Sequence, residues 1–414
     1  MDLGCVVTDD QRQLVQMWTQ RCREQEQALG PDHPDALASR HSLAEAHRTA
    51  GYLRRALLLF RQVLSERERV LGPDHPDTLA SRHAVADASL DVGDLKRSRE
   101  LFEQVLSDRE RILGPDHPDT LASRHAVAYA YWRGGAVERA VPLAARVLAD
   151  RERLLGADHP DTLASRNSLA GAYVVRGDLG RARELFEQVR AGREQVLGPH
   201  HPETLRVRDN LGVLLIEEGR PEEAKRLLAE VLDERERLLG PDHPDTVISG
   251  NGLATASAAA GDPQGRQLLE AAVAASARVL GDQHPDTLAM RHNLARIALA
   301  DGLFLRARQS LEQVVLAWER ALLADHPHAL AARNDLAAAC ERCGDSEKAI
   351  ALLTALLADS ARVLGDDHRL TELFRKNLTN AQRTAAREAE EMKPPVFGYG
   401  SGGFSTGHYG GCPF

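Results

Sequence analysis

Histidine is the residue that repeats most regularly along this chain, and it is a common metal ligand. It recurs every 41 or 42 residues, at His33, His75, His117, His159, His201, His243, His284, His326 and His368. Side chains a full repeat apart cannot share one ion. Most of these histidines are followed by Pro and an acidic residue, which is typical of a first helical turn. We therefore expect them, or in the second unit the preceding Asp74, to cap helices, and we expect no metal or other cofactor.

Two of the five cysteines, Cys340 and Cys343, form a Cys-x-x-Cys pair. A structural zinc site needs four ligands, and no second pair accompanies this one. We interpret both as small core residues on one face of a helix, with a redox switch as the alternative. Cys5, Cys22 and Cys412 are too scattered for a disulfide framework, which favours a reduced, cytoplasmic protein.

A ladder of opposite charges flanks the repeated histidines. An arginine stands seven residues after eight of them, at Arg40, Arg82, Arg124, Arg166, Arg208, Arg291, Arg333 and Arg375. A glutamate stands seven residues before seven of them, at Glu26, Glu68, Glu110, Glu152, Glu194, Glu236 and Glu319. Helical spacing places the arginine on a stripe that faces another helix, so we expect Arg–Glu pairs across the seam between helices. Anion binding along this ladder is the alternative.

Patterns typical of catalysis are missing from the sequence. It contains no Gly-x-Ser-x-Gly turn, no His-Glu-x-x-His pair and no Gly-Lys-Ser/Thr phosphate loop. We expect a protein without enzymatic activity.

The residues between the histidines indicate two helices in every unit. In the second unit Pro76 fits the first turn of a helix that stops near Gly93, and its apolar residues recur at helical spacing, at Leu79, Val85 and Ala86. The next helix ends at Gly114 and carries one apolar face, at Leu95, Leu101, Phe102, Val105 and Leu106. A lone helix pair cannot bury its apolar stripe, so the units must stack. The predicted fold is all-α, an α-solenoid of antiparallel helix pairs.

Composition agrees with such a fold. Of 414 residues, 43% are hydrophobic but only 4% are aromatic, so the core must consist of Leu, Ala and Val. The net charge of −9 argues against nucleic-acid binding, and no apolar run is long enough to span a membrane. The acidic start of the chain does not resemble a signal peptide. Only 5 of 52 basic residues are Lys, which indicates a GC-rich, actinobacterial-like bacterial genome.

These motifs resemble the tetratricopeptide-repeat family, in particular its 42-residue kinesin-light-chain type. The matching pattern is Leu-Gly-x-Asp-His-Pro-x-Thr-Leu, then Asn-x-Leu-Ala, a Gly turn and Leu-Phe. It is matched best over residues 155–186, and the resemblance covers about residues 11–391. It implies a superhelix whose concave groove binds protein segments, without naming a partner.

The resemblance also implies which residues line the groove. In the family, asparagines on the first helix of each unit hold the backbone of a bound peptide, and the matching residues here are Asn167, Asn251 and Asn334, with Asn210 and Asn293 at the family's second asparagine position. The first units depart from this pattern, with His41, His83 and His125. Four residues further on lies a variable row, at Glu45, Asp87, Tyr129, Gly171, Val213, Thr255, Arg296 and Ala338. We interpret its variation as a specificity surface, with random drift as the alternative.

The solenoid is expected to need caps at both ends. We predict an N-terminal capping helix with Leu14 and Trp18 on its apolar face. The predicted segments are 1–28 for this cap, 29–368 for eight repeat units, 369–393 for a C-terminal capping helix and 394–414 for a Gly- and aromatic-rich tail.

The unit that begins at His243 is irregular. Gly250 and Gly252 replace helix formers, and the turn at 261–265 lacks one residue. Because glycine weakens a helix, we predict local weakness or a change of superhelical pitch in this unit.

The aromatic segment, residues 394–414, has no acidic or basic side chain and is predicted to be disordered when alone. Its candidate functional residues are Phe397, Tyr399, Phe404, Tyr409, Cys412 and Phe414. It is either a docking peptide, a core that a tailoring enzyme modifies, or an end without function.

The leading functional hypothesis is a scaffold or adaptor that holds a partner peptide or helix in the concave groove. One alternative is a carrier or leader-like protein whose aromatic segment is the functional part. Another is a regulatory array for a separate signalling ATPase.

Overall fold

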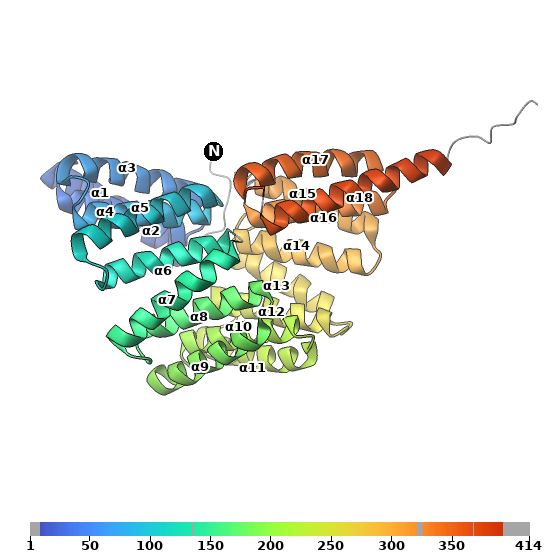
Figure 1. Ribbon diagram of the computed structural model, residues 1–414, viewed down its shortest axis with the longest axis horizontal. Coiled ribbons are helices and arrows are strands. Elements are labelled where there is room, and N and C mark those ends of the chain that lie inside the picture. Colours follow the sequence, from blue (N-terminus) through green and yellow to red (C-terminus); the bar gives the residue numbers. More distant parts are fainter. Residues whose placement is uncertain (1–8, 135, 321–325, 367, 392–414) are drawn as a thin grey trace, which may run out of the picture.

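The computed structural model (Figure 1) describes residues 9–134, 136–320, 326–366 and 368–391, and within these ranges every regular element is an α-helix. The eighteen helices are α1 (Asp9–Leu29), α2 (Pro34–Thr49), α3 (Leu53–Leu71), α4 (Pro76–Asp91), α5 (Leu95–Leu113), α6 (Pro118–Arg133), α7 (Val137–Leu155), α8 (Pro160–Arg176), α9 (Leu179–Leu197), α10 (Pro202–Glu217), α11 (Pro221–Leu239), α12 (Pro244–Ala259), α13 (Gly265–Val279), α14 (Pro285–Ala300), α15 (Phe304–Arg320), α16 (Pro327–Arg342), α17 (Ser346–Val363) and α18 (Arg369–Glu391). The predicted all-α solenoid is confirmed.

Each unit consists of an even-numbered first helix and an odd-numbered second helix. The apolar stripe that the sequence predicts forms the core: Leu79 and Ala86 of α4 and Phe102 and Val105 of α5 are at most 2% exposed. Neighbouring helices along the chain pack on one another from α1 to α18. Each unit therefore buries its stripe against the next one, as a solenoid requires.

Glycine ends most second helices for a conformational reason. After α5, Gly114 has φ 89° and ψ 166°, a backbone conformation that side chains with a Cβ essentially cannot adopt. Gly72 and Gly156 take the same conformation after α3 and α7. This fixed turn aims the next unit in the same way each time, so near-identical units curve regularly.

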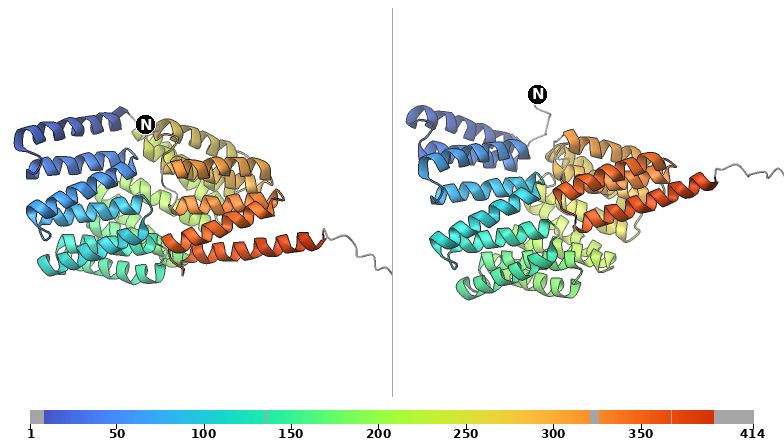
Figure 2. Two further views of the ribbon diagram at one scale, coloured as in Figure 1. Left: turned by 90° about the horizontal axis from the view of Figure 1, so that it is seen from above. Right: turned by 45° about the horizontal axis from the view of Figure 1, so that its top comes forward.

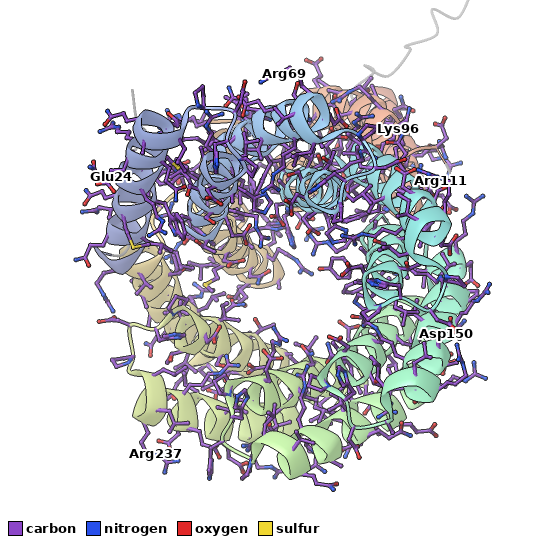
Figure 3. All side chains as sticks on the ribbon, turned by 90° about the vertical axis from the view of Figure 1, so that its left-hand side faces the viewer. Glu24, Arg69, Lys96, Arg111, Asp150 and Arg237 are labelled. Atoms are coloured by element: carbon purple, nitrogen blue, oxygen red, sulfur yellow. The ribbon has the colours of Figure 1, made fainter. Side chains whose placement is uncertain are left out.

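The units close into a ring when the solenoid is viewed along its axis (Figure 3). Glu24, Arg69, Arg111 and Asp150, which lie on α1, α3, α5 and α7, mark its outer rim. Successive first helices contact one another from α6 to α16, which places them on the inner side of the curve. We call the inner side of these first helices the concave surface.

The curve brings distant segments together. The first units and the last units lie beside each other (Figure 2), and one hydrophobic cluster contains Ala130 of α6 together with Ala329 and Ala332 of α16. The array is therefore an almost closed coil whose successive turns touch.

The two capping helices differ in how they fit the sequence-based prediction. In α1, Cys22 is buried and Trp18 is half-buried, whereas Leu14 is 37% exposed, so Leu14 lies outside the packed face that we predicted for it. At the other end, α18 is anchored by Phe374 and Ala381, which are 1% and 0% exposed. The predicted aromatic segment, residues 394–414, lies outside the described residues.

The irregular unit forms both of its helices. Gly250 and Gly252 lie inside an uninterrupted α12, and α13 is shortened to 15 residues. A Cβ on Gly265 would lie 2.6 Å from the backbone nitrogen of Ala258, so the missing residue is accommodated by a close approach that only glycine permits.

Candidate functional site: the concave surface

The nine repeated histidines are helix caps. In every one, Nδ1 accepts a hydrogen bond from the backbone N–H two residues further on, as in His75 to Asp77 at 3.1 Å and His368 to Leu370 at 3.0 Å. Asp74 is not a cap, because its carboxylate forms an ion pair with Arg111 at 2.6 Å. Within the ranges that the structure covers, no His, Cys, Asp and Glu side chains gather as a metal site would need.

The structure brings most of the predicted charge ladder together. Arginine and glutamate meet across the seam in five pairs, Arg40–Glu26, Arg82–Glu68, Arg124–Glu110, Arg166–Glu152 and Arg333–Glu319. Many of these arginines also hold an acid of the following helix, as Arg82 does with Asp108 at 2.7 Å. One guanidinium thus joins three helices and spends its hydrogen bonds on protein carboxylates, which leaves little of it for an external anion.

Three arginines of the ladder take other partners. Arg208 pairs with Glu230 and Glu234, while Glu194 is held by Arg190. Arg291 pairs with Asp282, and Arg375 with Asp366. In the case of Arg291 the reason is local, because alanines stand where the seam acids of other units stand. They are Ala277 on α13 of the irregular unit and Ala317 on α15 of the following unit.

A second arginine set, which the sequence reasoning missed, is buried deeper. It occupies the position eight residues before the repeated histidine, at Arg67, Arg109, Arg151, Arg193 and Arg235, and each is between 2% and 8% exposed. Arg109 Nη1 donates to the carbonyl oxygen of Asp119 at 3.1 Å and to Ser123 Oγ at 2.8 Å, both on the next unit. The same bonds to carbonyl and serine recur for Arg67, Arg151 and Arg235.

Burial, aided by these guanidiniums, keeps two groove histidines uncharged. His83 lies 5.0 Å from the ring of Phe102, and burial, together with the nearby Arg109, lowers its pKa to about 4. Burial and Arg151 lower the pKa of His125 to about 4 as well. The groove imidazoles of the first units are therefore neutral near pH 7, and each can both donate and accept a hydrogen bond.

The predicted groove residues form a ladder of their own between units. Asn210 Nδ2 donates to Asn167 Oδ1 at 3.0 Å, and Asn377 Nδ2 donates to Asn334 Oδ1 at 2.7 Å. His292 Nε2 lies 2.8 Å from Asp335 Oδ2 in the same register. The predicted groove asparagines are thus half-buried and partly engaged with each other, so the groove face is only partly solvated.

Other groove positions keep unused hydrogen-bonding capacity. Buried atoms without a partner include Nδ1 of His41, Nδ1 of His83 and Oδ1 of Asn251. Asn293 is half-buried beside His292. A bound chain or ordered water is the usual partner for such atoms.

Two acids of this surface have raised pKa values because they are buried. The pKa of Asp87 rises to about 7 despite the nearby Arg48, and that of Asp209 rises to about 6. Asp209 nevertheless contacts Arg235 at 2.8 Å and accepts from Ser249 at 3.0 Å. Of these two, Asp87 on α4 is therefore the acid that stays largely neutral up to about pH 7.

The variable row gives each part of the concave surface a different chemistry. It begins with the acids Glu45 and Asp87, continues with Tyr129, is apolar at Val213, which is 49% exposed, and is basic at the exposed Arg296. The buried arginine contacts between neighbouring helices recur in several units, whereas the residue types in the variable row differ.

The cysteine pair splits between core and surface. Cys340 is fully buried in α16, and burial raises the pKa of its thiol. Cys343 is exposed just past the end of that helix, so the interpretation of both as core residues was wrong for Cys343.

Within the described part of the chain, no helix has the long apolar stretch that crossing a bilayer requires.

Comparisons with solved structures point to repeat proteins. A crystal structure of "putative kinesin light chain nearly identical TPR-like repeats" from Podosopora anserina is 36% identical, covering 49% of this chain and 97% of that one, with a TM-score of 0.42. BtubC (BKLC) from P. vanneervenii is 20% identical over 54% of this chain and 91% of that one, with a TM-score of 0.45. The quorum sensor NprR from B. thuringiensis is 12% identical over 85% and 99%, with a TM-score of 0.52, and it shares the fold.

A comparison with curated proteins found no match to the chain. A comparison with protein-family models did identify a family. Two models described as tetratricopeptide repeat match successive stretches of it. The matched residues are 36–77, 78–119 and 120–161 for one model, and 167–233, 251–319 and 288–358 for the other. Together they span more than half of the chain. The chain therefore belongs to the tetratricopeptide-repeat family, whose members serve as protein-interaction scaffolds.

Proposed function

We propose that the concave surface holds an extended peptide segment of a partner protein. The observation that carries this proposal is the variable row, which changes from acidic to aromatic, apolar and basic on an otherwise repeated scaffold. The buried seam is more uniform, since five successive units place a buried arginine eight residues before the repeated histidine.

The polar ladder supplies contacts that do not depend on the partner's side chains. Asn and neutral His both donate and accept, as the backbone of an extended peptide requires. In the first units His41 and His83 pack edge-on against phenylalanine rings, which restricts them to fewer bonds. We therefore assign most of the backbone contacts to the later units, around Asn251, Asn293 and Asn334.

The test uses two valines with equal exposure. Val213 lies in the variable row of α10, whereas Val196 lies near the end of α9, a second helix, and each is 49% exposed. Proteins that the wild-type chain captures from its native host, identified by mass spectrometry, should be lost with Val213→Asp and kept with Val196→Asp.

Both variants should keep the helical circular-dichroism spectrum, because an exposed valine contributes little to stability. If the wild-type chain, Val213→Asp and Val196→Asp capture the same partners equally, the concave surface is not the binding site. The carrier and ATPase-regulator alternatives stay predictions, and the second of them would be supported by a nucleotide-binding protein among the captured partners. The tailoring enzyme also stays a prediction, and an unmodified intact mass with an alkylatable Cys412 would contradict it.

A further inference from the structure

A cavity of about 850 Å³ lies where successive turns of the coil meet. One wall comes from α6, α7 and α8, with Trp132 and Val137 among its residues, and the other from the first turn of α18, with Leu370 and Leu373. These walls are more than 190 residues apart in sequence. We call this the inter-turn cavity, and it is separate from the variable row of the concave surface.

The residues that line the inter-turn cavity suit an uncharged aromatic side chain. Leu373 is 42% exposed although it is apolar, and Trp132 adds an aromatic wall. Arg133, Arg176 and Arg369 also line the cavity. Arg176 already lies 4.6 Å from the centroid of the Tyr173 ring, which shows that guanidinium groups here can stack on aromatic rings.

We propose that the aromatic segment of the same chain occupies the inter-turn cavity through Phe404 and Tyr409. This segment has no charged side chain to desolvate, and it carries rings separated by glycines. It is also tethered to α18, the helix that forms one wall, so its local concentration at the cavity is on the order of millimolar.

The reach of the chain decides which rings can dock. From Arg369 to Glu391, α18 rises 1.5 Å per residue, so its far end is about 33 Å from the cavity. Figure 2 shows the helix starting beside the α6–α7 region and pointing away from the body. An extended chain covers at most about 3.6 Å per residue, so at least about nine residues are needed to return.

Phe397 and Tyr399 lie six and eight residues beyond Glu391 and are therefore too close to reach the cavity. Phe404 lies thirteen residues beyond it, a reach of about 45 Å, and Tyr409 lies five residues further. Glycines at 398, 400, 402 and 403 permit the sharp reversal of direction. The same segment thus contains three rings that can reach the cavity, Phe404, Tyr409 and Phe414, and two that cannot.

Photo-cross-linking tests the contact directly in the full chain. Leu373 is replaced by benzoylphenylalanine, which its exposure should tolerate, and the cross-linked peptides are identified by mass spectrometry. We expect links to residues 403–414 within one chain. Links to other segments alone, or none, would overturn the proposal, and links at the mass of a dimer would show a second copy as the occupant and overturn the intramolecular arrangement.

Hydrogen exchange provides the matched control. We compare Phe404→Ala/Tyr409→Ala with Phe397→Ala/Tyr399→Ala, which remove the same ring types. Amides of residues 369–373 should exchange about tenfold faster in the first variant, a factor that corresponds to about 1.4 kcal/mol of lost docking. They should be unchanged in the second. If the exchange rate of these amides changes in neither variant, or equally in both, the proposal that Phe404 and Tyr409 dock in the cavity is wrong.

Discussion

The buried arginine–serine seam permits a quantitative prediction from one repeated contact. Arg109 is 8% exposed and donates from Nη1 both to Ser123 Oγ and to the carbonyl oxygen of Asp119. Among the residues that the structure describes, no carboxylate forms an ion pair with this guanidinium, so its hydroxyl and carbonyl partners offset the loss of hydration. Breaking one bond should therefore cost more than at an exposed site.

A double-mutant cycle of Arg109→Met and Ser123→Ala isolates that bond. Hydrogen bonds to charged groups contribute about 1.5–3 kcal/mol, and each single change leaves a buried donor or acceptor unpaired. We expect each single variant to lose about 1.5–2 kcal/mol and the coupling between them to be about 1.5 kcal/mol. The double variant should thus be clearly more stable than the sum of the two losses predicts.

The chain contains its own control. At Arg193 the serine position is taken by Val207, and the guanidinium instead holds the carbonyl and carboxylate of Glu203 at 2.8 and 3.1 Å. The cycle of Arg193→Met and Val207→Ala should therefore couple by less than about 0.5 kcal/mol.

Repeat arrays do not unfold in one cooperative step, so the measurement must be local. Hydrogen exchange of the slowest amides in α5 and α6, referred to those in α17, reports the opening free energy of the affected units. If the two cycles couple equally, the seam is held by packing alone and the reasoning from hydrogen bonds is wrong.

Three further predictions concern other parts of the array. Because burial raises the pKa of Asp87 to about 7, the folded chain keeps a proton that the unfolded chain releases from about pH 4, and stability falls as the pH rises through 7. Asp87→Asn should accordingly slow exchange in α4 relative to wild type at about pH 8 and have little effect near pH 4. Asn167→Ala removes the acceptor of an inter-unit bond and should lower the opening free energy that hydrogen exchange reports for α8 and α10 by about 1 kcal/mol, whereas Asn251→Ala, whose amide oxygen has no partner, should lower that of α12 clearly less. Exchange should be faster in residues 249–265 than in residues 71–155, and equal protection would contradict the predicted weakness of the irregular unit.

The sequence predicted features that depend on one unit and its nearest neighbour. Histidine caps and glycine stops are set by residues within a few positions of each other, so they could be read from the chain. The pairing of Arg82 with Glu68 follows from helical spacing once two helices are placed side by side.

Features that depend on the whole coil could not be predicted in this way. Arg67 stands in the run Ser65-Glu66-Arg67-Glu68-Arg69, which has the composition of a solvated helix face, and only the next unit buries it. The recurrence of a serine fourteen residues after most of these arginines was the available signal. The sequence contains no comparable signal for the inter-turn cavity, because the cavity depends on small rotations that accumulate over several units.

The position of the buried arginine shows why such an array can change its binding surface freely. In later units Ser276 takes this position and bonds Thr287 Oγ1 at 2.7 Å, and Trp318 takes it and stacks on His326 with ring centroids 4.9 Å apart. Arginine, serine and tryptophan all fill the space between a second helix and the next first helix, so the seam requires filling rather than one residue type. Because Val213 is 49% exposed and lies outside the buried seam, a change there need not disturb the stacking. Stability and recognition can therefore diverge separately, unit by unit, along one nearly repeated chain.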